Sequence, residues 1–362
     1  MPHRHLWNVE LSNLVLLHIL FRHGNRTPTN YYTFKGDTNL GLYQPYGPGQ
    51  LTNEGKRRAY GLGQYIRGKY IDFIGNNYIP GVLDPLCTES DRAQVSLQLF
   101  LAGLFPPIDA LIWNKDLLWQ PIPYKYNSAA NDKILACLHN HEFLDEHIKY
   151  QKESGIFEKH KAFFEFVSQK VGFKVNGLVD IWRLYIRLIT ETEYGSKLPD
   201  WTAEIFPKPL EDFAIENYLT QMMTPKMRSM AIGELTNKII LDTNAKLAAK
   251  SRVKVHIYSA HELNVAHLLL GLKSFIPPHL PNYCSCLIFE IRERKGDIYV
   301  QVLYKRNFCG KTEQLPLWGN NPCQFDMFVK IFYEKNVVPY FIDNLSPEIS
   351  PNIFLSTRQD LF

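Results

Sequence analysis

Residues 14–28 of the chain are LVLLHILFRHGNRTP. The first seven are rich in leucine and β-branched residues and too few for a typical helix, so they predict a buried strand. His23 follows that strand directly and stands between Arg22 and Arg26. In open α/β sheets, binding sites form outside the carboxyl ends of strands. The stretch therefore predicts a core strand and a candidate site at its end.

Two arginines and a histidine in this order suit a tetrahedral oxyanion. Arginine presents a planar fork of donors and stays charged at any working pH. A neutral imidazole between two such groups can attack phosphorus as a nucleophile. The competing interpretation is a turn with a solvated arginine pair and an incidental histidine. The position of the motif after a buried strand favours a phosphate site built from Arg22, His23 and Arg26.

A second cluster follows the apolar run at 253–258, where the sequence continues Ser259-Ala260-His261-Glu262. His261 is placed to donate to phosphate oxygens, and Glu262 is the one ionisable acid of that block. A carboxyl group beside a phosphate dianion tends to stay protonated under acidic conditions, as a general acid requires. The alternative is a carboxylate at a helix start next to a surface histidine.

The order of strand and helix patterns predicts an α/β fold, a doubly wound mixed sheet domain with an inserted α-helical cap domain. Strand and helix signals alternate over 14–128, with helices after Thr52 and from Asp91 to Leu104. We expect residues 1–129 and 251–362 to form the α/β domain and residues 130–250 the cap. Helical patterns in the cap span 142–153, 157–171, 176–193, 211–223 and 226–250. Beyond the cap, the patterns predict a strand at 253–258, a helix at 263–271, a hairpin of 284–292 with 297–304, and a helix at 324–335.

The motif at residues 22–28 resembles the signature R-H-G-x-R-x-P of the histidine acid phosphatase family. Further blocks are similar to those of the family and come in its order: 51–55, then Asp91-Arg92 heading a helix that ends at 104–107, and finally His261-Glu262. The resemblance covers about residues 14–325. It points to branch 2 of the histidine phosphatase superfamily and, within it, to insect venom and salivary acid phosphatases.

The resemblance implies an acid phosphatase that hydrolyses phosphomonoesters through a phosphohistidine. His23 would be the nucleophile, Arg22, Arg26 and His261 would bind phosphate, and Glu262 would protonate the leaving group. This chemistry needs no metal and no cofactor. The expected partners are a small phosphorylated substrate and a second copy of the chain in a homodimer.

Two departures from the family pattern bear on activity. Leu86 stands where the best-known branches carry a third phosphate-binding arginine, and a lost charged hydrogen bond costs about 1.5 to 3 kcal/mol. Glu262 replaces the commoner aspartate. They motivate an alternative, a catalytically weak secreted ligand-binding or antigenic protein of the same fold. A phosphoglycerate mutase-type phosphotransferase also shares the Arg-His-Gly start, but the long helical insertion and the late His-Glu block argue against it.

Composition excludes several partner classes. Forty basic and 36 acidic residues give a net charge of +4, too balanced to indicate nucleic acid or an anionic membrane. No run of eighteen apolar residues predicts a membrane span. The first residues lack the apolar core of a signal peptide. The resemblance nevertheless favours a secreted, extracellular or lysosomal protein whose signal is removed or omitted from the chain.

Six cysteines allow several pairings, and their spacing does not suggest zinc. They are Cys87, Cys137, Cys284, Cys286, Cys309 and Cys323. Cys284 and Cys286 share one face of a strand, where Cα atoms lie about 7 Å apart, near the limit for a disulfide. Cys309 and Cys323 bracket a loop and are the favoured pair. Cys87 is equally consistent with a buried free thiol.

Overall fold

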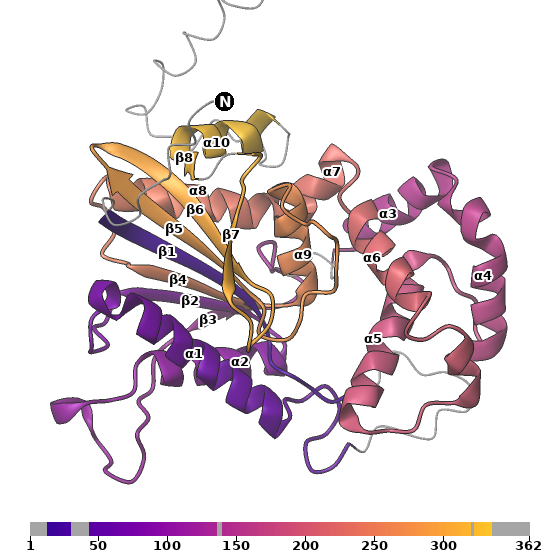
Figure 1. Cartoon of the computed structure of the whole chain (residues 1–362), viewed down its shortest axis with the longest axis horizontal. Helices are drawn as coiled ribbons and strands as arrows, with labels where there is room; N and C mark the ends of the chain where they lie inside the picture. The colour runs from indigo at the N-terminus through magenta and orange to yellow at the C-terminus, as the bar shows by residue number, and fades with distance from the viewer. Residues whose placement is uncertain (1–12, 30–42, 136–139, 320–321, 335–362) are drawn as a thin grey trace, which may run out of the picture.

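The computed structural model describes residues 13–29, 43–135, 140–319 and 322–334. Its centre is an eight-stranded sheet in the order β3-β2-β4-β1-β5-β6-β7, with β8 paired to β6 (Figure 1). The strands are β1 (Asn13–Arg22), β2 (Leu83–Thr88), β3 (Lys125–Asn127), β4 (Val255–Ala260), β5 (Cys286–Arg294), β6 (Asp297–Lys305), β7 (Thr312–Leu315) and β8 (Cys323–Gln324).

The sheet is mixed, and its parallel half positions the site. β1, β4, β2 and β3 are parallel neighbours, whereas β5, β6 and β7 continue the sheet antiparallel from β1. In the register of β1 with β4, Arg22 lies opposite Ala260. The residues that follow these two strands, His23 and His261, therefore leave the sheet at the same edge.

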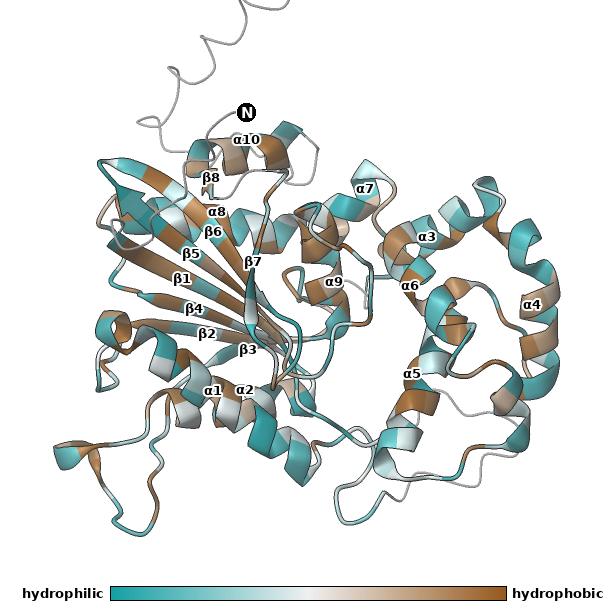
Figure 2. Ribbon diagram, in the orientation of Figure 1, coloured by the Kyte–Doolittle hydropathy of each residue, from teal (hydrophilic) through white to brown (hydrophobic). Residues whose placement is uncertain are grey.

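Helices cover both faces of the sheet. α1 (Asn53–Ile74) and α2 (Asp91–Leu104) lie on one face, and α8 (Glu234–Leu247), α9 (Glu262–Gly271) and α10 (Phe325–Glu334) lie on the other (Figure 1). The side chains of β1 are divided between the two faces of the sheet. Leu17 and Ile19 pack in the hydrophobic cluster under α1 and α2, and Leu16 and Leu20 pack in the hydrophobic cluster on the other face. Figure 2 shows the resulting hydrophobic strands between helices with hydrophilic outer surfaces. The predicted doubly wound α/β arrangement is confirmed.

A group of helices lies beside the sheet, beyond the carboxyl ends of its parallel strands (Figure 1). They are α3 (His141–Glu153), α4 (Ile156–Val171), α5 (Leu178–Tyr194), α6 (Leu210–Thr220) and α7 (Pro225–Arg228). The helix predicted over 226–250 is confirmed with its ends slightly earlier, because α7, a π-helical turn at Ser229–Gly233 and α8 follow one another as one continuous helical stretch. Its last part, α8, runs along the sheet, where Ile239 and Ile240 join the core under β1.

The cysteines of the described residues are free thiols. The Cys309–Cys323 pair predicted from the sequence is therefore wrong, because Cys309 is exposed while Cys323 is buried. Cys284 and Cys286 do not pair either, as their spacing indicates, and Cys87 is a buried thiol whose pKa burial raises to about 12. Cys137 lies outside the described residues. Among the described helices, none combines the length and apolar character needed to cross a membrane.

Candidate active site

The end of β1 is held by backbone contacts to three other segments. The amide of His23 donates to the carbonyl of Ala260 at 3.0 Å, and the amide of Gly24 donates to the Ser96 hydroxyl of α2 at 3.0 Å. A Cβ on Gly24 would lie 2.4 Å from the carbonyl oxygen of Gly55, so only glycine lets the first turn of α1 approach this closely. The motif is therefore wedged between the sheet and the starts of two helices.

The ring of His23 has its two nitrogens in different environments. Nδ1 lies 2.8 Å from the Gly24 carbonyl, which can only accept, so Nδ1 carries the proton. Nε2 accepts a hydrogen bond from Nε of Arg92 at 3.2 Å. Burial lowers the pKa of His23 well below its ordinary value, and the positive charge of Arg92 and the neighbouring His261 lower it further. The ring is neutral, with the Nε2 lone pair facing the site.

Arg22 and Arg26 are both buried at the floor of the site, with 6% and 8% of their surfaces exposed. Nε of Arg22 forms an ion pair with Glu262 at 3.2 Å, and its Nη1 donates to the Pro281 carbonyl at 2.7 Å. Nη1 of Arg26 donates to the Thr27 carbonyl at 2.9 Å. Within the described part of the chain, Nε of Arg26 is buried without a hydrogen-bond partner. Such a donor is available to an anion.

His261 and Glu262 join the motif from the end of β4. His261 is the N-cap of α9, and its backbone amide donates to the Asn264 side chain at 3.1 Å. Nitrogen or oxygen atoms of His23, His261 and Glu262 all lie within 4.8 Å of one another. The rings of His23 and His261 meet edge to face with centroids 5.3 Å apart. The structure thus brings together the residues that the sequence singled out, across more than 230 positions.

Several residues at the site were not singled out from the sequence. Arg92, in the first turn of α2, reaches His23 as described, although Asp91-Arg92 was noted only as a block. The Thr88 hydroxyl at the end of β2 lies 3.0 Å from Nε2 of His261. Tyr283 covers the Arg22 guanidinium with its ring, 3.9 Å from centroid to Cζ. Thr88 was detectable as a polar residue ending a parallel strand, whereas nothing local in the sequence marks Tyr283.

Leu86, the residue at the missing arginine position, lies two residues before Thr88 on β2. Its side chain is 7% exposed and packs in the apolar cluster that contains Leu20 and Tyr258. The Leu86 side chain packs in the core, so it does not leave an empty space where an arginine could reach the phosphate. A guanidinium does reach His23 Nε2 from the neighbouring helix, where Arg92 Nε donates to it at 3.2 Å.

Among the residues that the structure describes, two groups of side chains have the spacing of metal ligands. One is His23, His261 and Glu262, but Arg22 and Arg92 already direct positive charge at Glu262 and His23. The arrangement therefore suits an anion better than a cation.

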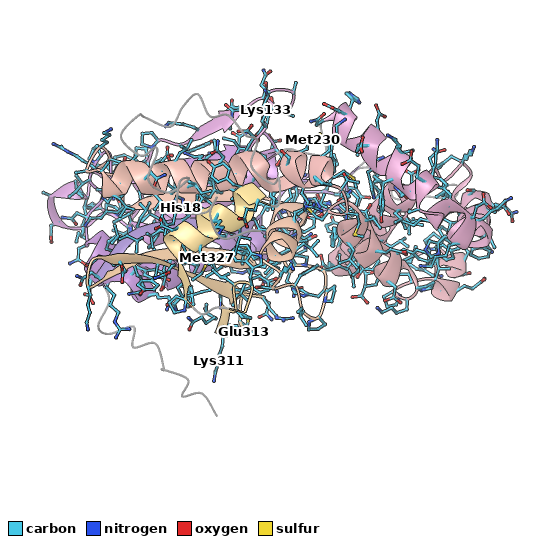
Figure 3. The ribbon with its side chains drawn as sticks, turned by 90° about the horizontal axis from the view of Figure 1, so that it is seen from above. His18, Lys133, Met230, Lys311, Glu313 and Met327 are labelled. Atoms are coloured by element: carbon cyan, nitrogen blue, oxygen red, sulfur yellow. The ribbon has the colours of Figure 1, made fainter. Side chains whose placement is uncertain are left out.

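The other group is His18, Asp242 and His256, which lies under α8. His18 is labelled in Figure 3, where the molecule is seen from above. The imidazoles of His18 and His256 stack nearly parallel at 4.7 Å, so their lone pairs cannot converge on one ion. The ammonium of Lys238 lies 2.8 Å from Asp242 and occupies the cationic position.

Comparison with solved structures shows which proteins share this fold. A phytase from Citrobacter braakii is similar with a TM-score of 0.64 over 89% of this chain and 97% of that chain, at 17% identity. A Klebsiella phytase is similar with a TM-score of 0.63, over 91% of this chain and 98% of that chain, at 14% identity. At such low identity, the likeness concerns the fold.

Sequence comparison finds more similar relatives. Venom acid phosphatase Acph-1 of Apis mellifera is 32% identical over 91% of this chain and 86% of its own length. Human prostatic acid phosphatase is 29% identical over 90% of this chain and 86% of its own length. Lysosomal acid phosphatase of Xenopus laevis is 31% identical over 81% of this chain and 69% of its own length. The model of the histidine phosphatase superfamily, branch 2, matches residues 13–305, and the chain belongs to that family.

Proposed function

We propose that the protein is an acid phosphatase that hydrolyses phosphomonoesters through a phosphohistidine at His23. One observation carries the proposal. The unprotonated Nε2 of His23 faces a site lined by Arg22, Arg26 and Arg92, with Glu262 within 4.8 Å of that ring. Phosphoryl transfer needs positioning and neutralised charge more than covalent help from the protein, and this arrangement supplies both.

In the first half-reaction, the substrate phosphate binds to the arginines and to His261. Nε2 of His23 attacks phosphorus in line, the phosphorus–oxygen ester bond breaks, and the leaving oxygen takes a proton from the carboxyl group of Glu262. Glu262 pairs with Arg22 in the free protein at 3.2 Å. A phosphate dianion competes for that guanidinium, which favours a protonated Glu262 in the complex.

In the second half-reaction, water attacks the phosphohistidine. The Glu262 carboxylate takes a proton from the water, the nitrogen–phosphorus bond breaks, and inorganic phosphate leaves. The hydrogen bond that Nδ1 of His23 donates to the Gly24 carbonyl keeps the imidazole in one tautomer through both half-reactions. The three arginines hold the transferred group in both steps and provide the charge stabilisation.

The experiment that tests this function is trapping of the intermediate. Rapid mixing with a ³²P-labelled phosphomonoester followed by alkaline quench should yield an acid-labile, alkali-stable label on the wild type and none on His23→Ala. Hydrolysis by His23→Ala at the wild-type rate would contradict the mechanism.

Glu262→Gln provides the second arm of the same experiment. The variant should hydrolyse alkyl phosphates far more slowly than the wild type, because an alkoxide needs a proton to leave. Aryl phosphates should be affected much less, since a phenolate leaves unaided. Equal losses on both substrate classes would remove Glu262 from the role of general acid.

The alternative of a catalytically weak binding protein rested on Leu86. Arg92 supplies a third guanidinium at His23 Nε2, so the loss at position 86 does not leave the phosphate without charge. The acid phosphatase relatives likewise do not favour that alternative. Turnover of any phosphomonoester by the wild type separates the two functions.

We further propose a cap formed by α3–α7 over the site, an extracellular or lysosomal location, and a homodimer. The names of venom and lysosomal relatives support the location. The dimer is supported by exposed hydrophobic side chains in the segment between α2 and β3, namely Leu111, Ile112, Trp113, Leu117, Leu118 and Trp119. Sedimentation of the wild type and of Trp113→Asp tests it, with a monomer expected for the variant.

A further inference from the structure

Tyr283 lies in a tight turn that is fastened to the end of β1. Tyr283 and Cys284 are the central residues of this turn, which closes where the amide of Ser285 donates to the carbonyl of Asn282 at 2.9 Å. Cys284 has a φ of 57°, in the left-handed region that residues other than glycine seldom adopt. Its amide donates to the carbonyl of Arg22 at 3.1 Å, and the amide of Arg22 donates to the carbonyl of Ser285 at 3.0 Å. The turn is therefore held in one position beside the motif.

The turn brings the ring of Tyr283 against the first two residues of the motif. The ring centroid lies 3.9 Å from Cζ of Arg22, so the guanidinium stacks on one face of the ring. The same centroid lies 5.7 Å from that of the His23 imidazole, with 46° between the two ring planes. Tyr283 is buried, and a cation–π contact that is shielded from water is stronger than one on the surface.

The other contacts of Arg22 lie at the edge of its guanidinium group. Nη1 donates to the carbonyl of Pro281 at 2.7 Å, and Nε forms the ion pair with Glu262 at 3.2 Å. Within the described residues, Nε has no well-aligned hydrogen bond, so the ion pair directs the group weakly. Two contacts at the edge still allow the plane to rotate about the line that joins them. The ring of Tyr283, which lies against the face of the plane, blocks this rotation.

The orientation of the Arg22 plane determines how well it binds an oxyanion. The N–H groups of arginine point outward in the plane of the guanidinium, so a rotated plane directs them away from the phosphate oxygens. A side chain that becomes ordered only when the ligand binds also lowers the affinity, because its lost freedom opposes binding. An arginine that is already held in place avoids both costs.

We propose that Tyr283 is a positioning residue whose ring holds Arg22 in the orientation that binds the phosphate group of the substrate. The inference rests on the proposed function for the presence of phosphate at Arg22. The ring face carries the role, and the hydroxyl does not. Within the described part of the chain, Oη of Tyr283 is buried without a well-aligned hydrogen bond, so its removal breaks no such bond.

The test is the dissociation constant of inorganic phosphate, measured by calorimetry where binding is tight and by ³¹P NMR titration where it is weak. Tyr283→Leu should weaken binding about three- to tenfold, the cost of ordering one long side chain. Tyr283→Phe keeps the ring face and should bind phosphate as tightly as the wild type. A Tyr283→Phe protein that binds as weakly as Tyr283→Leu would overturn the proposal, because the hydroxyl would then carry the role.

A double-mutant cycle with Arg22 separates positioning from packing. Arg22→Met should weaken phosphate binding about ten- to hundredfold through the loss of a charged hydrogen bond. In that background Tyr283→Leu should cause no further loss, because the ring has no guanidinium to hold. An equal loss in both backgrounds would overturn the proposal, since the ring would then support the site by packing alone.

Phe289→Leu is the matched control for the loss of a buried ring. Phe289 lies on β5 opposite His18, five residues before His23, and is 1% exposed. The variant should be less stable than the wild type and bind phosphate equally well. If Tyr283→Leu does not fold, Tyr283→Met replaces it, because the flexible methionine side chain fills irregular space. Unchanged phosphate affinity in the variant at Tyr283, or an equal loss in Phe289→Leu, would overturn the proposal.

Turnover separates this inference from the proposed function. Weaker phosphate binding in Tyr283→Leu, with no hydrolysis of any phosphomonoester by the wild type, would retain the role of Tyr283 and reject the phosphatase. Hydrolysis by the wild type, with unchanged phosphate affinity in Tyr283→Leu, would retain the phosphatase and reject the role of Tyr283.

Discussion

His23 is kept neutral and in one tautomer by contacts at the two ends of its ring. The Gly24 carbonyl holds the proton on Nδ1, and Arg92 donates to Nε2. A nucleophile that approached a phosphate dianion as imidazolium would have no lone pair to offer. Burial and the Arg92 charge both lower the pKa of His23, so the ring stays nucleophilic in mildly acidic solution.

Replacing Arg92 by methionine should therefore change both the rate and its pH dependence. Loss of a charged donor to phosphate should lower kcat/KM about ten- to hundredfold, which corresponds to 1.5 to 3 kcal/mol. Without the neighbouring charge the pKa of His23 rises, so activity on the acidic side should fail at a higher pH than in the wild type. A kcat/KM profile against pH measures both effects, with Arg57→Met on the exposed face of α1 as control. An unshifted acidic limb would show that Arg92 does not act on His23.

Leu86→Arg should lower stability rather than restore a phosphate ligand. Leu86 is buried among apolar side chains, where an unpaired guanidinium costs more than about 3 kcal/mol. Urea unfolding measures the loss, and Leu86→Met, which conserves volume, should cost less than about 1.5 kcal/mol. A stable Leu86→Arg protein with tighter phosphate binding would contradict the orientation of this side chain.

At the scale of elements, a buried ion pair joins α5 to the chain around the motif. Nη2 of Arg187 lies 2.6 Å from Oε1 of Glu191, and both side chains are 2% exposed. The same guanidinium donates to the Tyr43 hydroxyl and to the Thr29 carbonyl. The group thus links α5 to the segment that leaves the active site.

Arg187→Met should destabilise the protein by about 3 to 5 kcal/mol, because it leaves the Glu191 carboxylate buried without its cation. The double variant Arg187→Met, Glu191→Leu should recover most of that loss, since a buried apolar pair removes both charges together. Unfolding free energies of the two single variants and the double variant complete the cycle. Strictly additive losses would show that the two side chains do not act as a pair.

At the scale of the whole molecule, buried neutral histidines work against stability in acid. Burial, with a smaller contribution from His147, lowers the pKa of His267 to about 3, and burial lowers that of His147 to about 4. Between the ordinary value of 6.5 and these values, the unfolded chain binds protons that the folded chain does not. The free energy of unfolding therefore falls as the pH drops below 6.5 and recovers above it.

His267→Gln should flatten this dependence. The glutamine amide can still donate to Oε1 of Gln221, which lies 3.0 Å from the histidine Nε2. Between pH 7 and pH 5, the wild type should lose about 2 kcal/mol more stability than His267→Gln, from a displacement of about 1.5 pH units. Urea unfolding at the two pH values measures the difference, and equal slopes would show that His267 is protonated in the folded protein.

Local patterns in the sequence determined the elements that carry the site. The apolar run before Arg22 predicted β1, and the helix expected from Asp91 to Leu104 has those bounds in the structure as α2. Hydrophobic patterns of this kind lie within a few residues of the element that they determine, so they can be recognised in a single sequence. Arg22, His23 and Arg26 were found for the same reason, because one strand end presents them together.

Only the tertiary structure decided which distant side chains complete the site. Arg92 reaches His23 across the interface of β1 with α2, and the ring of Tyr283 reaches Arg22 from the loop before β5. Leu86 shows the same limit, because the core on one face of the sheet decides that its side chain is buried. The parallel pairing of β1, β4 and β2 brings the side chains at their carboxyl ends together. Pairing between strands that are distant in the chain cannot be recognised in any short stretch of sequence.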